Sequence, residues 1–220
     1  MQFIKDIFII KEIPHLTWSS KNSLNFKPKL FTFLYLIFGL FMFGLGETIL
    51  ITSSIGVSPW TVLAQGISFN SSLSIGFSTA IVSTVVLFLW LPLKQKPGIG
   101  TIFNIIIISL VIDYSNLYLP HPDQLYLQIM QCFVGVFFIG LGSGFYLISN
   151  LGPGPRDGLN IGLSKVTKLP IFLIRTAIEF FAAALGWYLG GVVGLGTVIF
   201  AIFVGPFVSF GLVIVKNIFK

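Results

Sequence analysis

Four ionisable side chains lie inside long apolar stretches of the sequence, namely Glu47, Asp113, Arg175 and Glu179. A charge inside a membrane is costly, so each is a candidate for an ion or solute pathway. Arg175 and Glu179 are four residues apart, and on one helix face they can instead neutralise each other as a structural ion pair. Glu47 and Asp113 have no cation nearby in the sequence. A snorkelling or packing role and an ion or proton pathway both fit them.

A second candidate site is a pair of related segments rich in glycine and proline, 53–68 and 149–164. Their candidate ligand-binding residues are Gly56, Pro59 and Trp60 in the first segment and Gly152, Pro155, Arg156 and Asp157 in the second. In each segment the proline can begin a short helix, with Ser58 or Gly154 as its cap and Gly66 or Gly162 at its end. Such helices could dip into the membrane and present their N-terminal amides to a ligand. The alternative is a pair of surface helices that only fix packing.

Arg156 and Asp157 form a charge pair in the second segment that could bind a ligand. The planar guanidinium of Arg156 suits a carboxylate or phosphate on a solute or a lipid headgroup. Asp157, in the first turn, favours the helix N-terminus and is expected to orient Arg156. Alternatively, Arg156 only adds to the cytoplasmic positive charge that Lys165 and Lys168 already supply.

Other chemistries find little support. The chain has two histidines and one cysteine, Cys132, which lies in an apolar run. A metal site or a Ser/His/Asp system is therefore not expected, and no Gly-Lys-Ser/Thr sequence marks a P-loop. We expect no catalytic residues, no cofactor and no enzyme activity.

The elements that position these residues must be membrane helices. The 220 residues are 55% hydrophobic and 9% charged, with a mean hydropathy of +0.96. Six apolar stretches stand out: 30–52, 72–93, 99–119, 126–149, 171–189 and 195–215. About 20 helical residues cross a hydrocarbon core of roughly 30 Å, so each stretch is a candidate span. The sequence predicts an all-α membrane protein with six transmembrane helices.

The positive charges predict the orientation of these spans. Lys and Arg precede the first stretch and follow the second, fourth and sixth, whereas the other three loops contain neither. By the positive-inside rule, both termini are cytoplasmic, and residues 1–29 form a basic cytoplasmic tail. The net charge of +6 thus has a topological explanation, and no nucleic acid partner is expected. The expected location is the bacterial cytoplasmic membrane.

An internal repeat sets the expected architecture. Shifting the sequence by 96 residues superposes 39–114 on 135–210 without a gap, and 19 of these 76 positions are identical. Many of the identities are glycine or proline, such as Gly46/Gly142 and Pro59/Pro155. Each copy holds three spans, an odd number, so the copies must enter the membrane from opposite sides. The prediction is two inverted three-helix repeats, 30–119 and 126–216, with short connector helices.

Three stretches carry a family resemblance: 56–60, 91–101 continuing to Asp113, and 151–159. With them, the chain resembles the YczE/YyaS/YitT-type bacterial integral membrane proteins from about Leu34 to Val215. The resemblance implies location and architecture, and no catalytic residue follows from it. Family members commonly have Asp after the Pro-Trp of the first connector, whereas this chain has Thr61 and keeps an acid only at Asp157.

The inverted repeats and broken connectors favour a transporter or permease for a small solute. The alternative is a non-transporting accessory protein that assembles or supports another membrane system. An intramembrane enzyme is less favoured, because Glu47 and Asp113 lack a recognisable companion. The expected partners are the lipid bilayer and either an unknown small solute or an unknown membrane protein.

Overall fold

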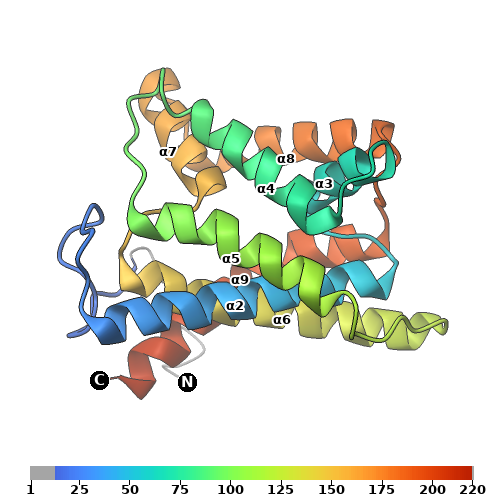
Figure 1. The fold of residues 1–220 in the computed structure, drawn as a ribbon, viewed down its shortest axis with the longest axis horizontal. Coiled ribbons are helices and arrows are strands. Elements are labelled where there is room, and N and C mark those ends of the chain that lie inside the picture. Colours follow the sequence, from blue (N-terminus) through green and yellow to red (C-terminus); the bar gives the residue numbers. More distant parts are fainter. Residues whose placement is uncertain (1–12, 220) are drawn as a thin grey trace.

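The computed structural model describes residues 13–219, and this part of the chain is helical without strands (Figure 1). Its helices are α2 (Leu30–Ser53), α3 (Pro59–Phe69), α4 (Ile75–Phe88), α5 (Ile99–Ser115), α6 (Leu125–Ser149), α7 (Pro155–Thr167), α8 (Ile171–Tyr188) and α9 (Leu195–Ile218). In the view of Figure 1, α3, α4, α7 and α8 lie above α2 and α6. The first 12 residues of the predicted tail lie outside the described part.

Within residues 13–219, four helices are long and apolar enough to cross a membrane: α2, α6, α8 and α9. The other two expected spans are shorter. The predicted bounds 72–93 are wrong for α4, which has 14 residues and a length of about 21 Å. Ser74 accepts a hydrogen bond from the Phe77 amide and begins this helix, and the chain turns after Phe88 to bury Trp90. Helix α5 has 17 residues and ends at Ser115, before the expected Leu119.

Helices α2 and α6, here called the central helices, make the most extensive contact between two described helices, and they run side by side in opposite directions (Figure 1). Glycines permit the two helices to approach this closely. A Cβ on Gly39 would lie 2.7 Å from the Gly142 carbonyl oxygen, and one on Gly46 would lie 2.6 Å from that of Gly135. These four glycines are two repeat pairs, and each pair contacts the other across the crossing. Small residues let helices pack by van der Waals contact where no hydrophobic effect drives association.

Each central helix ends in a left-handed residue, Ser54 or Asn150, before the connector begins. Gly56 and Gly152 follow with φ of 116° and 112°, a region that L-residues with side chains rarely adopt. The backbone of each connector then hydrogen-bonds to the start of a helix in the other repeat. The Gly100 amide donates to Leu151 O at 2.7 Å, and the Gly196 amide donates to Ile55 O at 2.8 Å.

Both connector helices begin at the predicted prolines, Pro59 and Pro155. The predicted ends of these helices are wrong. Gly66 and Gly162 do not end these helices, which continue to Phe69 and Thr167. Gly66 instead lets α3 approach α8, since a Cβ there would lie 2.6 Å from the Gly186 carbonyl oxygen.

Trp90 fixes the contact between α4 and α7. Its side chain is 1% exposed, and its indole N–H donates to the Pro155 carbonyl at 2.9 Å. A Cβ on Gly158 would lie 1.9 Å from the indole ring, so glycine at this position makes room for the tryptophan. Trp90, which follows α4, therefore holds the first turn of α7 against the end of α4.

The two ends of the described chain meet. Trp18 packs on Tyr35 and on Phe219, with ring centroids 4.6 Å and 5.9 Å apart, and the Ser20 amide donates to Ser149 O at 3.0 Å. Trp18 and Ser20, which belong to the predicted basic tail, therefore pack against the helices.

Candidate functional site

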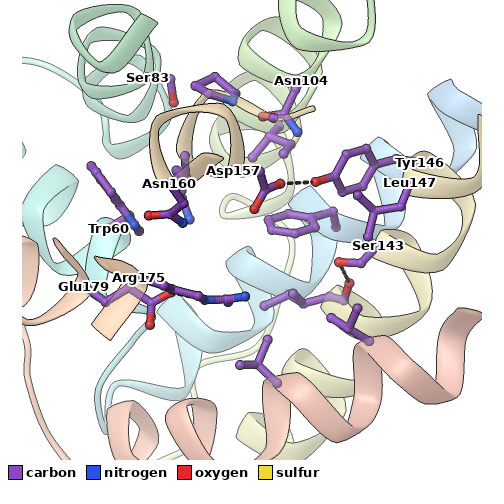
Figure 2. Close-up of a pocket in the computed structure, with 18 of the residues that line it drawn as sticks. Trp60, Ser83, Asn104, Ser143, Tyr146, Leu147, Asp157, Asn160, Arg175 and Glu179 are labelled. Atoms are coloured by element: carbon purple, nitrogen blue, oxygen red, sulfur yellow. Dashed lines mark hydrogen bonds and ion pairs between the residues drawn. The ribbon is translucent and has the colours of Figure 1, made fainter. Parts of the chain in front are cut away.

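A polar cavity of about 130 Å³ lies where the two connectors and their neighbouring helices converge (Figure 2). Much of its wall comes in pairs of residues 96 positions apart. These pairs are Phe43/Ile139, Trp60/Arg156, Thr79/Arg175, Ser83/Glu179, Asn104/Phe200 and Ile108/Val204. Equivalent positions of the two repeats thus face one space, although their side chains differ in chemistry.

Glu47 lies beside this cavity and is fully buried. Its carboxylate accepts hydrogen bonds from Ser58 Oγ at 2.9 Å and Thr61 Oγ1 at 2.8 Å, and Nη1 of Arg156 lies 3.9 Å from Oε1. Ser58 occupies the predicted N-cap position of α3, but its hydroxyl makes no capping hydrogen bond and donates to Glu47 instead. The snorkelling interpretation of Glu47 is wrong, since a cation from the other repeat approaches it inside the protein.

Arg156 is the cation that joins the repeats. Its guanidinium carbon lies 5.5 Å from the centroid of the Trp60 ring, which favours a positive charge over the ring face. Its side chain is 22% exposed, lines the cavity, and makes no hydrogen bond to any described residue. An arginine carries five N–H donors, so this side chain has donors available for a ligand.

Asp157 does not orient Arg156, which corrects the sequence-based expectation. Its carboxylate accepts a hydrogen bond from the Tyr146 hydroxyl of α6 instead (Figure 2). The acid lies in the first turn of α7, where a negative charge interacts favourably with the helix N-terminus. Asp157 therefore ties the connector helix to the central helix.

Arg175 and Glu179 form the predicted ion pair, with 2.8 Å between Nε and Oε1. Their side chains are 49% and 26% exposed, and both line the cavity beside Trp60 and Asn160 (Figure 2). The pair is therefore part of the candidate site as well as a local neutralisation.

Asp113 lies apart from this site. It accepts hydrogen bonds from Ser74 Oγ at 2.6 Å and the Gly76 amide at 2.7 Å, and so satisfies the N-terminus of α4. Gly56, Gly152 and Pro59 also do not line the cavity, although their connectors place Trp60 and Arg156 in its wall.

Several residues of the cavity wall escaped the sequence analysis, among them Asn160 and Tyr146. Asn160 lies one helical turn after Arg156, lines the cavity and is 8% exposed, and its Oδ1 has no hydrogen-bond partner among the described residues. The spacing of four residues from Arg156 could have revealed it. A buried amide oxygen without a partner points to a donor that arrives with a ligand or with water. Among the described residues, no group of three or more His, Cys, Asp or Glu could hold a metal ion.

Known proteins match this chain along most of its length. A protein of Haemophilus influenzae described as uncharacterized is 37% identical over 209 residues, which is 95% of each chain. The uncharacterized membrane protein YczE of Bacillus subtilis is 31% identical, covering 79% of this chain and 82% of its own. The uncharacterized protein YyaS of the same species is 26% identical, covering 76% and 85%. No solved structure matches.

The resemblance drawn from the connector motifs is thus confirmed. The relative YczE is described as a membrane protein, and in the described part of this chain four helices are long and apolar enough to span a membrane. The model of a family of unknown function, DUF6198, matches residues 30–212 and so includes every residue of the cavity wall. The chain is a membrane protein that belongs to this family.

Proposed function

We propose that this protein is a transporter or permease that binds a small anionic solute in the polar cavity between two inverted repeats. The observation that carries the proposal is the pairwise wall of the cavity, in which Arg156 presents hydrogen-bond donors without partners. Secondary transporters commonly bind their substrates at a repeat interface, beside helix N-termini of broken segments.

The helix boundaries support the repeat architecture. Helices α3 and α7, α4 and α8, and α5 and α9 begin at residues 96 positions apart, as Pro59 and Pro155 do. The glycine contacts between α2 and α6 and the exchanged connector hydrogen bonds are reciprocal, as a two-fold axis requires. In this proposal the shorter α4 and α5 also cross the membrane, so that each repeat has three spans.

The polar groups around the cavity favour an anionic solute. Each acid has a partner within the protein: Ser58 and Thr61 for Glu47, Tyr146 for Asp157, and Arg175 for Glu179. Among the described residues, the direct contacts of the Arg156 guanidinium are the ion pair at 3.9 Å and the contact with Trp60. A carboxylate or phosphate suits the free edge of the guanidinium, and an N–H or O–H on the same solute suits Asn160.

The volume of the cavity limits the size of the solute. Its volume of about 130 Å³ is well below the roughly 300–1,000 Å³ of sites that hold drug-sized ligands. A solute anion at Arg156 would compete with Glu47, the residue through which the two repeats attract each other. In this proposal, that competition couples binding to a change in how the repeats pack.

Replacing Arg156 with Gln is expected to weaken solute binding. Inorganic phosphate, acetate, pyruvate and glycine serve as probes, and the measurement is the shift in melting temperature of the purified protein. We expect at least one carboxylate or phosphate to raise the melting temperature of the wild-type protein. A charge-assisted hydrogen bond contributes about 1.5–3 kcal/mol, so its loss weakens binding by about tenfold or more.

Lys165→Gln is the matched control, because Lys165 is an exposed cation on the same helix. This variant should keep the full shift, and Arg156→Lys should lose most of it through the loss of planar donors. Uptake of the stabilising solute into proteoliposomes then tests transport. If Lys165→Gln and Arg156→Gln behave alike, the site assignment is wrong. If there is no uptake but a stable stoichiometric protein partner, the accessory role is favoured.

The proposed topology places both termini in the cytoplasm. The measurement uses alkaline phosphatase and green fluorescent protein fused after 70, 119, 168 and at the C-terminus. We expect phosphatase activity at 70 and 119 and fluorescence at 168 and at the C-terminus, because the positive loops stay inside. Phosphatase activity at the C-terminus would refute the proposal of six spans with both ends inside.

A further inference from the structure

An apolar groove of about 700 Å³ lies between α4 and α8, with α3 and α7 also contributing to its wall. It is formed almost entirely by equivalent positions of the two repeats, for example Leu63 with Leu159 and Val82 with Ile178. Deep in the groove, Val86 is 4% exposed and its equivalent Ala182 is 2% exposed.

The rim of the groove is open. Val85 is 54% exposed and its equivalent Phe181 is 68% exposed, while Leu89 is 48% exposed and its equivalent Leu185 is 39% exposed. The groove therefore runs from an exposed apolar rim to a buried apolar base. Its volume lies within the range of about 300–1,000 Å³ that is usual for ligand sites.

The groove and the polar cavity share a wall. Trp60 lines both, and its ring lies under the Arg156 guanidinium on the polar side. Consecutive residues divide between the two spaces: Val82, Leu159 and Ile178 line the groove, and Ser83, Asn160 and Glu179 line the polar cavity. An apolar site and a cationic site are thus adjacent on the same helix turns.

We propose that the groove binds the hydrocarbon tail of a single-chain amphiphile from the bilayer, whose small anionic headgroup enters the polar cavity at Arg156. The open rim lies on helices of a membrane protein, where hydrocarbon chains are the available apolar ligand. The cavity of about 130 Å³ selects a small headgroup, and the free donors of Arg156 select an anion. This inference rests on the proposed function for its headgroup site, and it names the substrate class.

A photoreactive fatty acid with a diazirine in the middle of its chain tests the tail site. The full-length protein is placed in lipid nanodiscs, irradiated with the probe, and its labelled peptides are mapped by mass spectrometry. We expect labelling to concentrate on the groove residues of α4 and α8, and excess unlabelled fatty acid to compete with it. Even labelling of all exposed helices would overturn the proposal.

Ala177→Phe fills the groove from an exposed position on α8, and Ala184→Phe makes the same change at an exposed position of that helix outside the groove. We expect the first variant to remove groove labelling and the second to retain it. Val85→Phe, on the opposite wall, gives an independent test should Ala177→Phe fold poorly. Labelling that survives both groove variants, or a cross-linked second copy in the groove, would overturn the proposal.

The methyl ester of the same probe tests the headgroup site. It keeps the tail and loses the charge, so we expect its groove labelling to require about tenfold more probe, the cost of one charge-assisted hydrogen bond. Equal labelling by acid and ester would overturn the headgroup assignment. The two proposals fail separately. If a solute stabilises the protein but the groove is not labelled, only the proposed tail site is wrong. If the groove is labelled but Arg156→Gln has no effect, only the proposed anion site at Arg156 is wrong.

Discussion

Replacing Glu47 with alanine is expected to destabilise the protein by about 3 kcal/mol, because it removes the acceptor shared by two buried hydroxyls and an arginine. Among the described residues, Arg156 then keeps its contact with Trp60. The substitution also removes the attraction between Glu47 of the first repeat and Arg156 of the second. The measurement is the midpoint of unfolding of the purified protein in a titration with sodium dodecyl sulfate, followed by circular dichroism.

Glu47→Gln separates the charge from the hydrogen bonds. It keeps an acceptor for Ser58 and Thr61, so we expect a smaller loss than with alanine. Glu179→Gln is the control, because its ion pair with Arg175 is partly exposed and such pairs contribute at most about 1 kcal/mol. If Glu47→Ala and Glu179→Gln shift the midpoint equally, Glu47 does not hold the repeats together.

Replacing Gly46 with valine is expected to separate α2 from α6 and to cost about 3 kcal/mol or more. A Cβ on Gly46 would lie 2.6 Å from Gly135 O and 2.7 Å from the amide nitrogen of Ile139. Both obstacles are backbone atoms, so no flexible side chain can move aside, and the helices themselves must shift. The measurement is the yield of monodisperse protein by size-exclusion chromatography, together with the melting temperature.

Gly205→Val is the matched control, since Gly205 also lies within a helix and a Cβ there would meet no atom within 4 Å. We expect this variant to retain the yield and the melting temperature of the wild-type protein. Equal losses from the two substitutions would mean that valine itself is poorly tolerated in these helices. The close approach of α2 and α6 would then not explain the glycines.

The backbone of the connectors could be predicted because local physics fixes it. Proline without an N–H is suited to the first helical turn, and glycine permits the positive φ that precedes it at Gly56 and Gly152. The ion pair of Arg175 and Glu179 is equally local, since four residues make one helical turn. The end of α4 was not predictable from hydropathy, because Leu89, Trp90 and Leu91 are as apolar as the helix that they leave.

The polar core of the site could not be predicted, because its contacts join residues far apart in the sequence. No local pattern indicates that Glu47 meets Arg156 or that Tyr146 donates to Asp157. The repeat does indicate which positions are equivalent, but it does not reveal that Trp60 and Arg156 face one cavity. Thr61 stands where family members commonly have Asp, and only the structure explains it, because its hydroxyl donates to the buried Glu47 of α2.

The exchanged hydrogen bonds of the connectors also determine the order in which the nascent chain can complete its fold. The Ile55 carbonyl receives its donor from the Gly196 amide, which the ribosome adds only near the end of synthesis. At about 5–20 residues per second, the first connector therefore waits several seconds for its partner while the intervening helices enter the membrane. The second connector has no such delay, because Gly100 is already present when Leu151 emerges. The two connectors have equivalent structures, but the second can form its hydrogen bond as it is synthesised, whereas the first must wait for the residues of α9.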